Sequence, residues 1–225
     1  MKKIVVVKQI LSANDQVAAE NRAAFAGAGV FVLNLMASPG AGKTSVILAT
    51  AARLSQGVRP AVIEGDLASS LDADIVAARG IPVVQINTGG NCHLDAPMVR
   101  AALPHLRLDE IDLLFIENVG NLVCPANFAL GADLAVVVAS VPEGHDKPYK
   151  YPGMFATADV VLLNKADLLE AFEFDVGYFR RGLEMVNPAA PLFLVSCRTG
   201  TGLDAWVEWL LKKRLSCSVA NMDKV

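Results

Sequence analysis

Seven short apolar runs, spaced along the sequence with longer stretches between them, restrict this chain to a narrow set of folds. The runs are Val30–Met36, Pro60–Ile63, Pro82–Ile86, Ile111–Ile116, Leu134–Val141, Val160–Leu163 and Leu192–Val195. Their Val, Ile and Leu residues are nearly continuous rather than alternating with polar ones, which is typical of strands buried on both faces. Stretches with helical spacing of apolar residues lie between them, such as Thr44–Leu54, Phe172–Val186 and Leu203–Lys213. We therefore predict an α/β fold, with a mostly parallel sheet and helices on both faces.

The chain length fits one domain of this kind, because 225 residues carry no composition shift that would divide them in two. We expect an N-terminal extension at 1–29 with a short helix near Asn14–Phe25, a nucleotide-hydrolase domain at 30–215, and a loose tail at 216–225. Ligands of such folds bind beyond the carboxyl ends of the strands. The motifs below all follow one of the apolar runs.

Composition excludes several classes of protein. The apolar runs are too short to cross a bilayer, and Met1–Gln9 is too short for a secretory signal, so we predict a cytoplasmic protein without membrane contact. A net charge of −3 without a basic stretch argues against nucleic acid as a partner. Four irregularly spaced cysteines are typical of reduced thiols with separate roles rather than of a disulfide framework.

A Gly-rich turn follows the first run and leads directly into a helical stretch. It reads Ala37-Ser-Pro-Gly-Ala-Gly-Lys-Thr44, a Walker A loop in which Ala replaces the usual first Gly. In such a loop the backbone N–H groups converge on phosphate oxygens, the lysine adds positive charge and the hydroxyl binds Mg²⁺. The predicted phosphate-binding residues are Gly40, Ala41, Gly42, Lys43, Thr44 and Ser45. The second lysine of the deviant Walker A ATPases is missing.

The base is predicted to be guanine, from the segment Asn164-Lys165-Ala-Asp167 after the sixth run. A carboxylate can accept hydrogen bonds from guanine N1–H and from its 2-amino group, which adenine lacks. Ser196, Cys197 and Arg198, after the last run, are predicted to back the guanine ring. We assign Cys197 to base packing rather than to metal binding.

Acidic residues between these two motifs are predicted to serve Mg²⁺ and the attacking water. Glu117 and Gly120 occupy the place of the Asp-x-x-Gly of GTPases, where the glycine N–H contacts the γ-phosphate. Asp66, and after it Asp72, are candidates for further Mg²⁺ or water-orienting oxygens. The predicted catalytic residues are Lys43, Asp66, Asp72, Glu117 and Gly120, and the predicted Mg²⁺ ligands are Thr44, Asp66 and Glu117. No glutamine or arginine is clearly placed for catalysis, so we expect slow turnover, on the order of 10⁻³ s⁻¹.

Soft metal ligands follow two of the predicted strands. Cys92 and His93 come after the third run, and Cys124 follows the Glu117 motif, so that all three leave the same edge of a parallel sheet. Three donors leave a tetrahedral site open to water or to a second copy of the chain. We predict a nickel or zinc site here, which GTP influences through the short link from Gly120 to Cys124. Each residue taken alone would more often be structural.

Five segments together resemble the HypB family of hydrogenase nickel-incorporation GTPases. They are Val32–Thr44, Ile86–Ala96, Ile116–Pro125, Glu143–Pro152 and Asn164–Leu168, and the resemblance runs from about Asn14 to Trp209. It implies a P-loop NTPase of the signal-recognition and MinD-like group that dimerises with nucleotide and holds metal at Cys92, His93 and Cys124. It also implies two partners, an accessory protein that carries nickel and the hydrogenase large subunit.

The chain departs from many relatives because it has only three histidines and no early cysteine, so nickel storage is not expected. Lys147 and Lys150 lie in a segment that looks like an interface in relatives, and either lysine could reach a partner's nucleotide. Two alternatives remain open at this point. One is a metal-buffering protein with a structural nucleotide, and the other is a urease-type nickel GTPase, whose motif is Cys-Pro-His. Nickel and zinc are not distinguished by the residue types alone.

Overall fold

The computed structural model describes residues 6–222 and confirms the predicted fold class. Seven parallel strands form one sheet in the order β3-β2-β4-β1-β5-β6-β7. The strands are β1 (Phe31–Ala37), β2 (Pro60–Asp66), β3 (Val83–Asn87), β4 (Leu113–Glu117), β5 (Leu134–Ser140), β6 (Val160–Asn164) and β7 (Leu192–Leu194). Each corresponds to one of the seven apolar runs. The order reverses beside β1, so that the loops after β1 and β4 meet at the switch point where α/β folds bind ligands.

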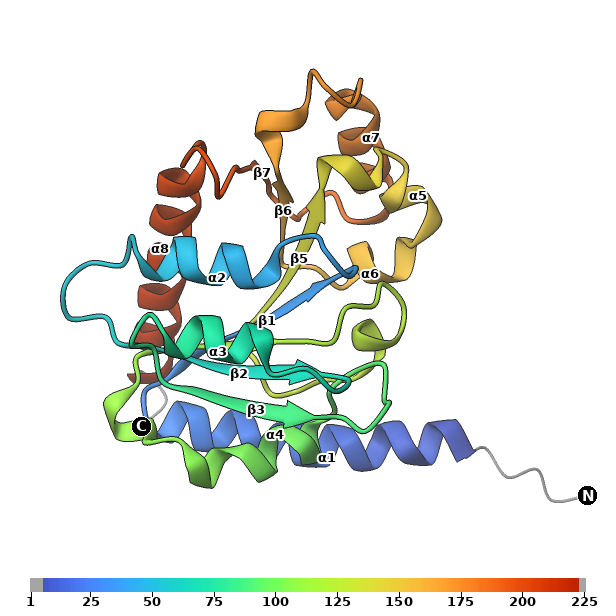
Figure 1. Cartoon of the computed structure of the whole chain (residues 1–225). Coiled ribbons are helices and arrows are strands. Elements are labelled where there is room, and N and C mark those ends of the chain that lie inside the picture. The colour runs from blue at the N-terminus through green and yellow to red at the C-terminus, as the bar shows by residue number, and fades with distance from the viewer. Residues whose placement is uncertain (1–5, 223–225) are drawn as a thin grey trace, which may run out of the picture.

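Eight α-helices and five short 3₁₀ turns are found in the described part of the chain (Figure 1). The helices are α1 (Val6–Gly27), α2 (Lys43–Ala51), α3 (Leu71–Ala77), α4 (Ala96–Ala102), α5 (Lys147–Lys150), α6 (Pro152–Ala156), α7 (Val176–Val186) and α8 (Leu203–Met222). The 3₁₀ turns are η1 (Leu103–His105), η2 (Leu108–Glu110), η3 (Cys124–Asn127), η4 (Val141–Glu143) and η5 (Ala166–Leu168). No helix among residues 6–222 is long and apolar enough to span a membrane.

The two terminal helices are longer than the sequence suggested. The short helix expected near Asn14–Phe25 begins at Val6, and α8 continues to Met222, so residues 216–222 are helical rather than loose. Neither helix contains Pro, and the only Gly in either is Gly27, at the end of α1. Once a helix has been nucleated, each further residue adds a hydrogen bond at little cost. Residues 1–5 of the predicted extension and 223–225 of the predicted tail lie outside the described residues.

Helices cover both faces of the sheet because successive strand residues point to opposite sides. On one face, Leu33 and Leu35 of β1 pack with α2, α3 and α8. On the other face, Val32 belongs to a core formed with α1 and α4, and Met36 belongs to a separate core formed with α6 and α7. The second face is therefore covered by two groups of helices.

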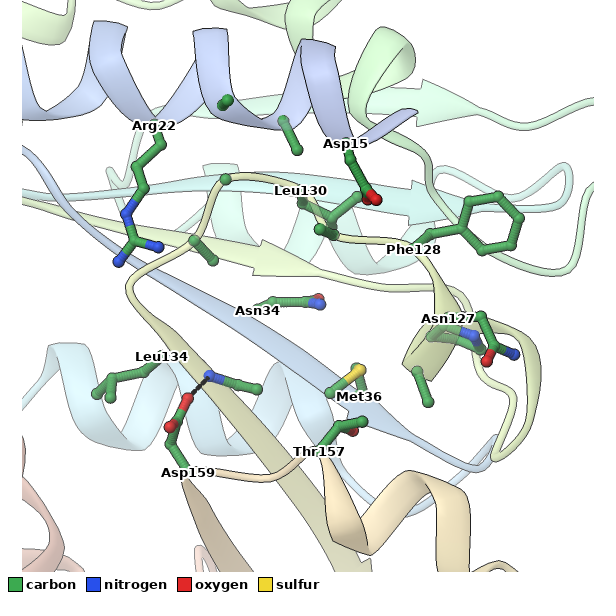
Figure 2. Close-up of a pocket in the computed structure, with 18 residues that line it drawn as sticks. Asp15, Arg22, Asn34, Met36, Asn127, Phe128, Leu130, Leu134, Thr157 and Asp159 are labelled. Atoms are coloured by element: carbon green, nitrogen blue, oxygen red, sulfur yellow. Dashed lines mark hydrogen bonds between the residues drawn. The ribbon is translucent and has the colours of Figure 1, made fainter. Parts of the chain in front are cut away.

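A cavity of about 520 Å³ separates these two groups (Figure 2). Asn34 and Met36 of β1 line this cavity. Arg22 of α1 and Phe128, in the loop that follows η3, line it as well. The Asn34 side chain is the polar interruption in an otherwise apolar central strand. It is 7% exposed, and its Oδ1 accepts a hydrogen bond from Asn118 Nδ2 at 3.1 Å.

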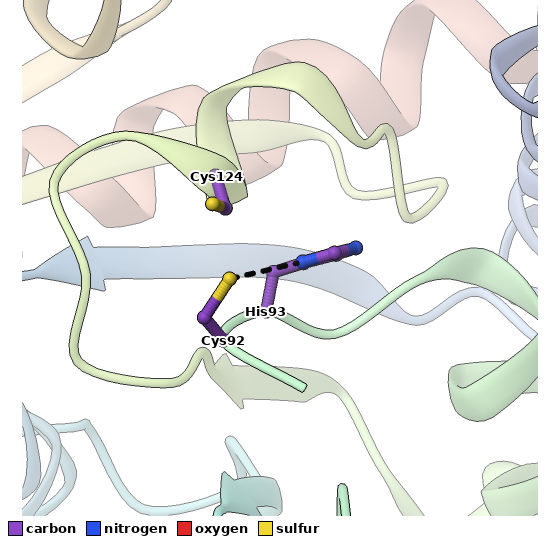
Figure 3. A group of neighbouring side chains, drawn as sticks. All are labelled: Cys92, His93 and Cys124. Atoms are coloured by element: carbon purple, nitrogen blue, oxygen red, sulfur yellow. Dashed lines mark hydrogen bonds between the residues drawn. The ribbon is translucent and has the colours of Figure 1, made fainter. Parts of the chain in front are cut away.

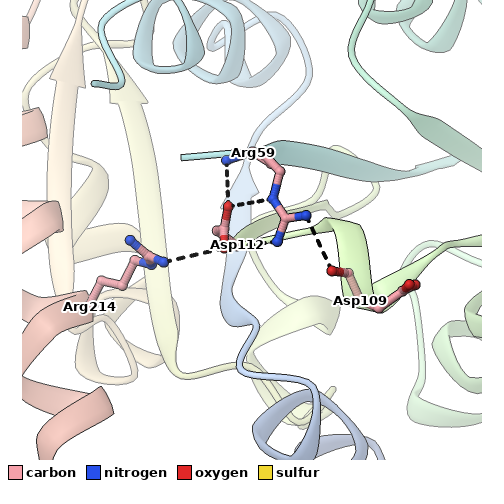
Figure 4. Close-up of polar contacts among 4 residues, drawn as sticks. All are labelled: Arg59, Asp109, Asp112 and Arg214. Atoms are coloured by element: carbon pink, nitrogen blue, oxygen red, sulfur yellow. Dashed lines mark hydrogen bonds and ion pairs between the residues drawn. The ribbon is translucent and has the colours of Figure 1, made fainter. Parts of the chain in front are cut away.

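An ion-pair network ties α8 to the amino ends of strands β2 and β4 (Figure 4). Asp112, just before β4, accepts hydrogen bonds from Arg59 Nε at 2.8 Å and from its Nη2 at 3.2 Å. The same carboxylate lies 3.7 Å from Arg214 Nη2 of α8. The Arg59 hydrogen bond lowers the pKa of Asp112 below its usual range. This attachment holds α8 just beyond Lys213, where the helical stretch expected from the sequence ended.

Candidate nucleotide and metal site

The predicted phosphate residues form the turn between β1 and the start of α2. Gly42 has a φ of 98°, and a Cβ at this position would lie 2.5 Å from Asn164 Nδ2. Glycine is thus required there both by the left-handed backbone and by the neighbouring side chain. Lys43 is the first residue of α2, and Thr44 Oγ1 donates to Glu117 Oε1 at 2.8 Å. The Lys43 Nζ lies 4.0 Å from the same oxygen.

The segment predicted to read the base also braces the phosphate loop. Asn164 Nδ2 donates to Ala41 O at 3.0 Å, and Lys165 Nζ donates to Gly40 O at 2.7 Å. Beside them is a cavity of about 290 Å³, lined by Gly42, Ser45, Asn164, Lys165, Asp167, Leu168, Cys197 and Arg198. The structure therefore brings together residues from three distant parts of the sequence in one pocket next to the phosphate loop.

Asp167 lies in this pocket with both carboxylate oxygens engaged. Its Oδ1 accepts from Ser196 Oγ at 2.6 Å, and its Oδ2 pairs with Arg198 Nε at 2.9 Å. The Ser196 hydrogen bond, and after it the Asp167 backbone amide and Arg198, lower the pKa of Asp167, which keeps the carboxylate ionised as an acceptor. Burial raises the pKa of Cys197 to about 11, so its thiol is neutral at pH 7. A neutral, half-buried thiol suits packing against a ring better than metal binding.

Two buried glutamates face each other on neighbouring strands beside Lys43. Glu64 of β2 is in register with Glu117 of β4, and each is 2% exposed. Burial, and then the neighbouring charge of Glu117, raises the pKa of Glu64 to about 8. Burial likewise raises the pKa of Glu117 to about 7, against the opposing effects of Lys43 and Thr44. Glu64 Oε2 and Glu117 Oε2 have no hydrogen-bond partner among the described residues.

The two candidate aspartates lie near Glu64 and Glu117. Asp66 ends β2, and its Oδ1 accepts from the backbone N–H groups of Ala68 and Ser69, at 2.9 and 2.7 Å. These bonds lower the pKa of Asp66. Asp72 lies in the first turn of α3, close enough for its charge to raise the pKa of Glu64. Glu64 is thus more deeply placed than either aspartate, although the sequence alone gave it no priority. Oxygen atoms gathered beside a phosphate loop suit Mg²⁺.

The three predicted metal ligands meet in space (Figure 3). One ligand atom from each of Cys92, His93 and Cys124 can be chosen so that all three lie within 4.8 Å of one another. Cys92 Sγ lies 3.7 Å from His93 Nδ1, and the imidazole stacks on Phe128 with ring centroids 3.9 Å apart. Bonds of ~2.0–2.3 Å from one ion to sulfur and nitrogen would need only a small contraction of this set.

The protonation states also suit a soft or borderline metal ion. Burial lowers the pKa of His93, which leaves a neutral imidazole able to donate a lone pair. The hydrogen bond with Cys92, and then burial, raises the pKa of the Cys124 thiol. Ion binding must therefore displace at least one thiol proton, so affinity should increase with pH.

Several positioning residues were not identified from the sequence. The carboxamide side chains of Asn118 and Asn121 bond backbone N–H groups in the two segments that carry the metal ligands. Asn14 of α1 bonds backbone groups of Ala96 and Ala129, a few residues beyond the ligands of each segment. Glu143 accepts hydrogen bonds from Ser38 of the phosphate loop and from Ser140, the latter at 2.7 Å. A polar Asn118 directly after the apolar run and Glu117 was the available signal, but only the tertiary structure shows its partners.

Comparisons with known proteins agree with this arrangement. Residues 31–194 match the model of the CobW/HypB/UreG nucleotide-binding domain. The chain is 50% identical to the hydrogenase maturation factor HypB of Escherichia coli K12 over 205 residues, which cover 91% of this chain and 71% of that protein. The chain belongs to the HypB family. The recognition made from the five sequence segments is thereby confirmed.

Two solved HypB structures extend the comparison to three dimensions. HypB from Helicobacter pylori in complex with nickel superposes with a TM-score of 0.88 at 41% identity, covering 92% of this chain and 97% of the other. HypB from Archaeoglobus fulgidus superposes with a TM-score of 0.84 at 37% identity, covering 90% and 99%. The sequence and structural comparisons thus agree on the fold and on the family.

Proposed function

We propose that this HypB-family protein is a slow GTP hydrolase that links its nucleotide state to holding and releasing nickel for the metal centre of a [NiFe]-hydrogenase. The observation that carries the proposal is the convergence of Cys92, His93 and Cys124 beside a turn that contacts the phosphate loop. A Cβ on Gly120 would lie 3.0 Å from Pro39 of that loop. The names of the relatives, which are hydrogenase maturation factors, support the same reading.

The nucleotide would be held by two sets of residues. Backbone N–H groups from Gly40 to Ser45 and the Lys43 ammonium bind the phosphates, while Asp167 reads guanine in the adjoining pocket of about 290 Å³. Thr44, Asp66 and Glu117 would hold Mg²⁺, which neutralises developing charge on the phosphates. The buried oxygens of Glu64 and Glu117 that lack partners fit this role.

Hydrolysis would rest mainly on positioning. Asp66 or Asp72 orients the attacking water, and the Gly120 N–H contacts the γ-phosphate, so that loss of this phosphate releases the turn. Turnover should be slow, on the order of 10⁻³ s⁻¹, because no glutamine or arginine is assigned to assist the water.

The metal cargo would bind to two thiolates and one imidazole. Three donors leave one position of a tetrahedral set open, which suits an ion that is to be handed on. The same donors accept nickel or zinc. Nickel is favoured as cargo by the H. pylori relative, whose structure is described as a complex with nickel.

The assembly would be a homodimer that depends on nucleotide, metal or both. Lys147 and Lys150 lie on α5 and are candidates to reach a partner's nucleotide. The accessory protein that carries nickel and the hydrogenase large subunit would be its cytoplasmic partners. Neither nucleic acid nor a membrane is required.

Metal titration of the purified protein tests the central proposal. Ni²⁺ is added in the presence of GDP or of a non-hydrolysable GTP analogue, with thiolate-to-metal absorbance and oligomeric state followed together. We expect one ion per site and affinities that differ between the two nucleotides by about 5- to 150-fold. Cys124→Ser should abolish the absorbance, whereas Cys217→Ser, on α8 and outside the site, should leave it intact. Equal affinities would refute the coupling.

Phosphate release distinguishes this proposal from a metal buffer with a structural nucleotide. The proposed hydrolase releases phosphate from GTP slowly, and Lys43→Ala abolishes that release. A wild-type protein that binds Ni²⁺ and GTP but releases no phosphate would favour the buffer. A urease-type role would instead require that Ni²⁺ reach apo-urease rather than the hydrogenase large subunit in a transfer assay.

A further inference from the structure

We propose that Asn118 is the positioning residue through which the nucleotide reaches the metal ligands, an inference that rests on the proposed function. Asn118 follows Glu117 at the end of β4 and is completely buried. It is not one of the predicted phosphate, base or metal ligands. Its side-chain carboxamide instead forms hydrogen bonds with two other parts of the site.

The Asn118 carboxamide connects two chain segments that lie far apart in the sequence. Its Oδ1 accepts from Val119 N and from Leu94 N, each at 3.0 Å. Val119 precedes Gly120, and Leu94 follows His93 directly in the chain. One oxygen atom is therefore shared between the turn proposed to contact the γ-phosphate and the segment that carries Cys92 and His93. Both N–H groups are buried and would be left unpaired without this oxygen. Movement of the turn at Val119 would therefore disturb the hydrogen bond to Leu94 N as well.

The attachment of Leu94 is tight on its other side as well. Leu94 is fully buried, and a Cβ on Gly65 of β2 would lie 2.6–2.7 Å from its side-chain carbons. Gly65 stands between Glu64 and Asp66, so the Leu94 side chain packs directly on the strand that carries the acidic residues. The segment that holds His93 is thus wedged between β2 and the Asn118 carboxamide, with little room to move independently.

A comparable link reaches the third ligand. Asn121 N donates to Ala37 O of the phosphate loop at 2.8 Å, and Asn121 Oδ1 accepts from Val123 N at 2.7 Å and Cys124 N at 3.4 Å. Gly120 stands between the two asparagines. A shift of the turn at residues 118–121 toward a γ-phosphate would move the His93 segment through Asn118 and Cys124 through Asn121. The distances between the three ligand atoms would then change.

A second buried asparagine provides a matched control. Asn14 of α1 is 4% exposed, and its Oδ1 accepts from Ala96 N at 2.8 Å, three residues beyond His93. Its Nδ2 donates to Ala129 O at 2.9 Å, beyond Cys124. Asn14 therefore supports the same two segments, but neither of these hydrogen bonds involves residues 118–121.

The experiment compares the Ni²⁺ affinity ratio between GDP and a non-hydrolysable GTP analogue in Asn118→Ala, Asn118→Asp and Asn14→Ala. We expect a wild-type ratio of about 5 to 150 that falls at least about threefold in Asn118→Ala, where only the Asn121 link to Cys124 remains, and is retained within about twofold in Asn14→Ala. Asn118→Asp keeps an oxygen for both N–H groups and should restore most of the ratio. A ratio retained in Asn118→Ala overturns the inference and leaves the proposed function standing. A wild-type ratio of 1 overturns both.

Amide hydrogen exchange of the wild-type protein covers the case in which Asn118→Ala does not fold. Replacing GDP by the GTP analogue should change the protection of residues 92–96 and of residues 118–121 together. If the metal affinity ratio differs between nucleotides while protection changes only at 118–121, Asn118 does not carry the coupling and the inference is wrong.

Discussion

The buried Glu64 carboxyl should make the metal-free, nucleotide-free protein lose stability as the pH rises toward 8. Its folded-state pKa is raised to about 8, well above the ordinary carboxyl value, mainly by burial. The folded protein therefore holds a proton that the unfolded chain releases. The stabilisation that this proton provides is fully present below the unfolded-state pKa and is lost as the pH rises through the folded-state pKa.

The size of the effect follows from the pKa difference. Each unit of pKa corresponds to about 1.4 kcal/mol. For one such group, the free energy of unfolding therefore falls by up to about 2 kcal/mol between pH 6 and pH 8. The adjoining Glu117 titrates in the same range, and the phosphate loop is open to water, so we expect about half of this, about 1 kcal/mol. In a domain of this size, that is a fall in Tm of about 2–4 °C.

Glu64→Gln tests this reasoning because the amide cannot titrate. Thermal unfolding is measured at pH 6 and pH 8, in chelator and without nucleotide, and the difference between the two pH values is compared rather than absolute stability. The variant should lose less stability than the wild type over this interval. Glu208→Gln is the control, since Lys212 lowers the pKa of Glu208 and no titration is expected there above pH 6. Equal pH dependence in wild type and Glu64→Gln would refute the assignment of a raised pKa to Glu64.

Three further predictions address the nucleotide pocket and the dimer. Asp167→Asn should weaken GDP binding by about tenfold to a hundredfold and improve binding of XDP, whose base has a carbonyl in place of the 2-amino group. Calorimetric titration with both nucleotides checks this. Unchanged GDP affinity would contradict it. Gly42→Ala should weaken GDP binding at least tenfold (about 1.4 kcal/mol) through its clash with the Asn-Lys-x-Asp segment, whereas Gly57→Ala, also at positive φ but with nothing within 4 Å, should affect stability alone. If Lys147 or Lys150 reaches a partner's nucleotide, its replacement by alanine should reduce GTP-induced dimerisation in sedimentation experiments; unchanged dimerisation in both variants would assign the two lysines to the solvated surface.

The sequence was sufficient for the fold because its strongest signals are local. Continuous runs of Val, Ile and Leu are stable as strands only when both faces are covered, which requires a parallel sheet with helices on either side. All seven runs became strands. The length of α8 was underestimated, and this helix makes a contact that no local pattern shows, between Arg214 and Asp112, about a hundred positions apart.

The residue types of the site could also be read in order along the chain. The Gly-Lys-Thr of the phosphate loop and the Asn-Lys-x-Asp segment each have one well-defined chemistry, and both follow strands whose carboxyl ends lie on the same edge. Cys92 and Cys124 were brought together by the same argument. The sequence therefore determined which groups gather at this edge.

Only the tertiary structure decided how these groups influence one another. Glu64 and Glu117 are in register because β2 and β4 are neighbours, an order that skips β3 and that no local pattern specifies. Burial then shifts their pKa values, and burial is a property of the whole core rather than of the motif. Asn118 is another example, because nothing in the sequence around it shows that its side chain accepts a hydrogen bond from Leu94 N. Local sequence sets chemistry and strand position, whereas long-range packing sets protonation and coupling.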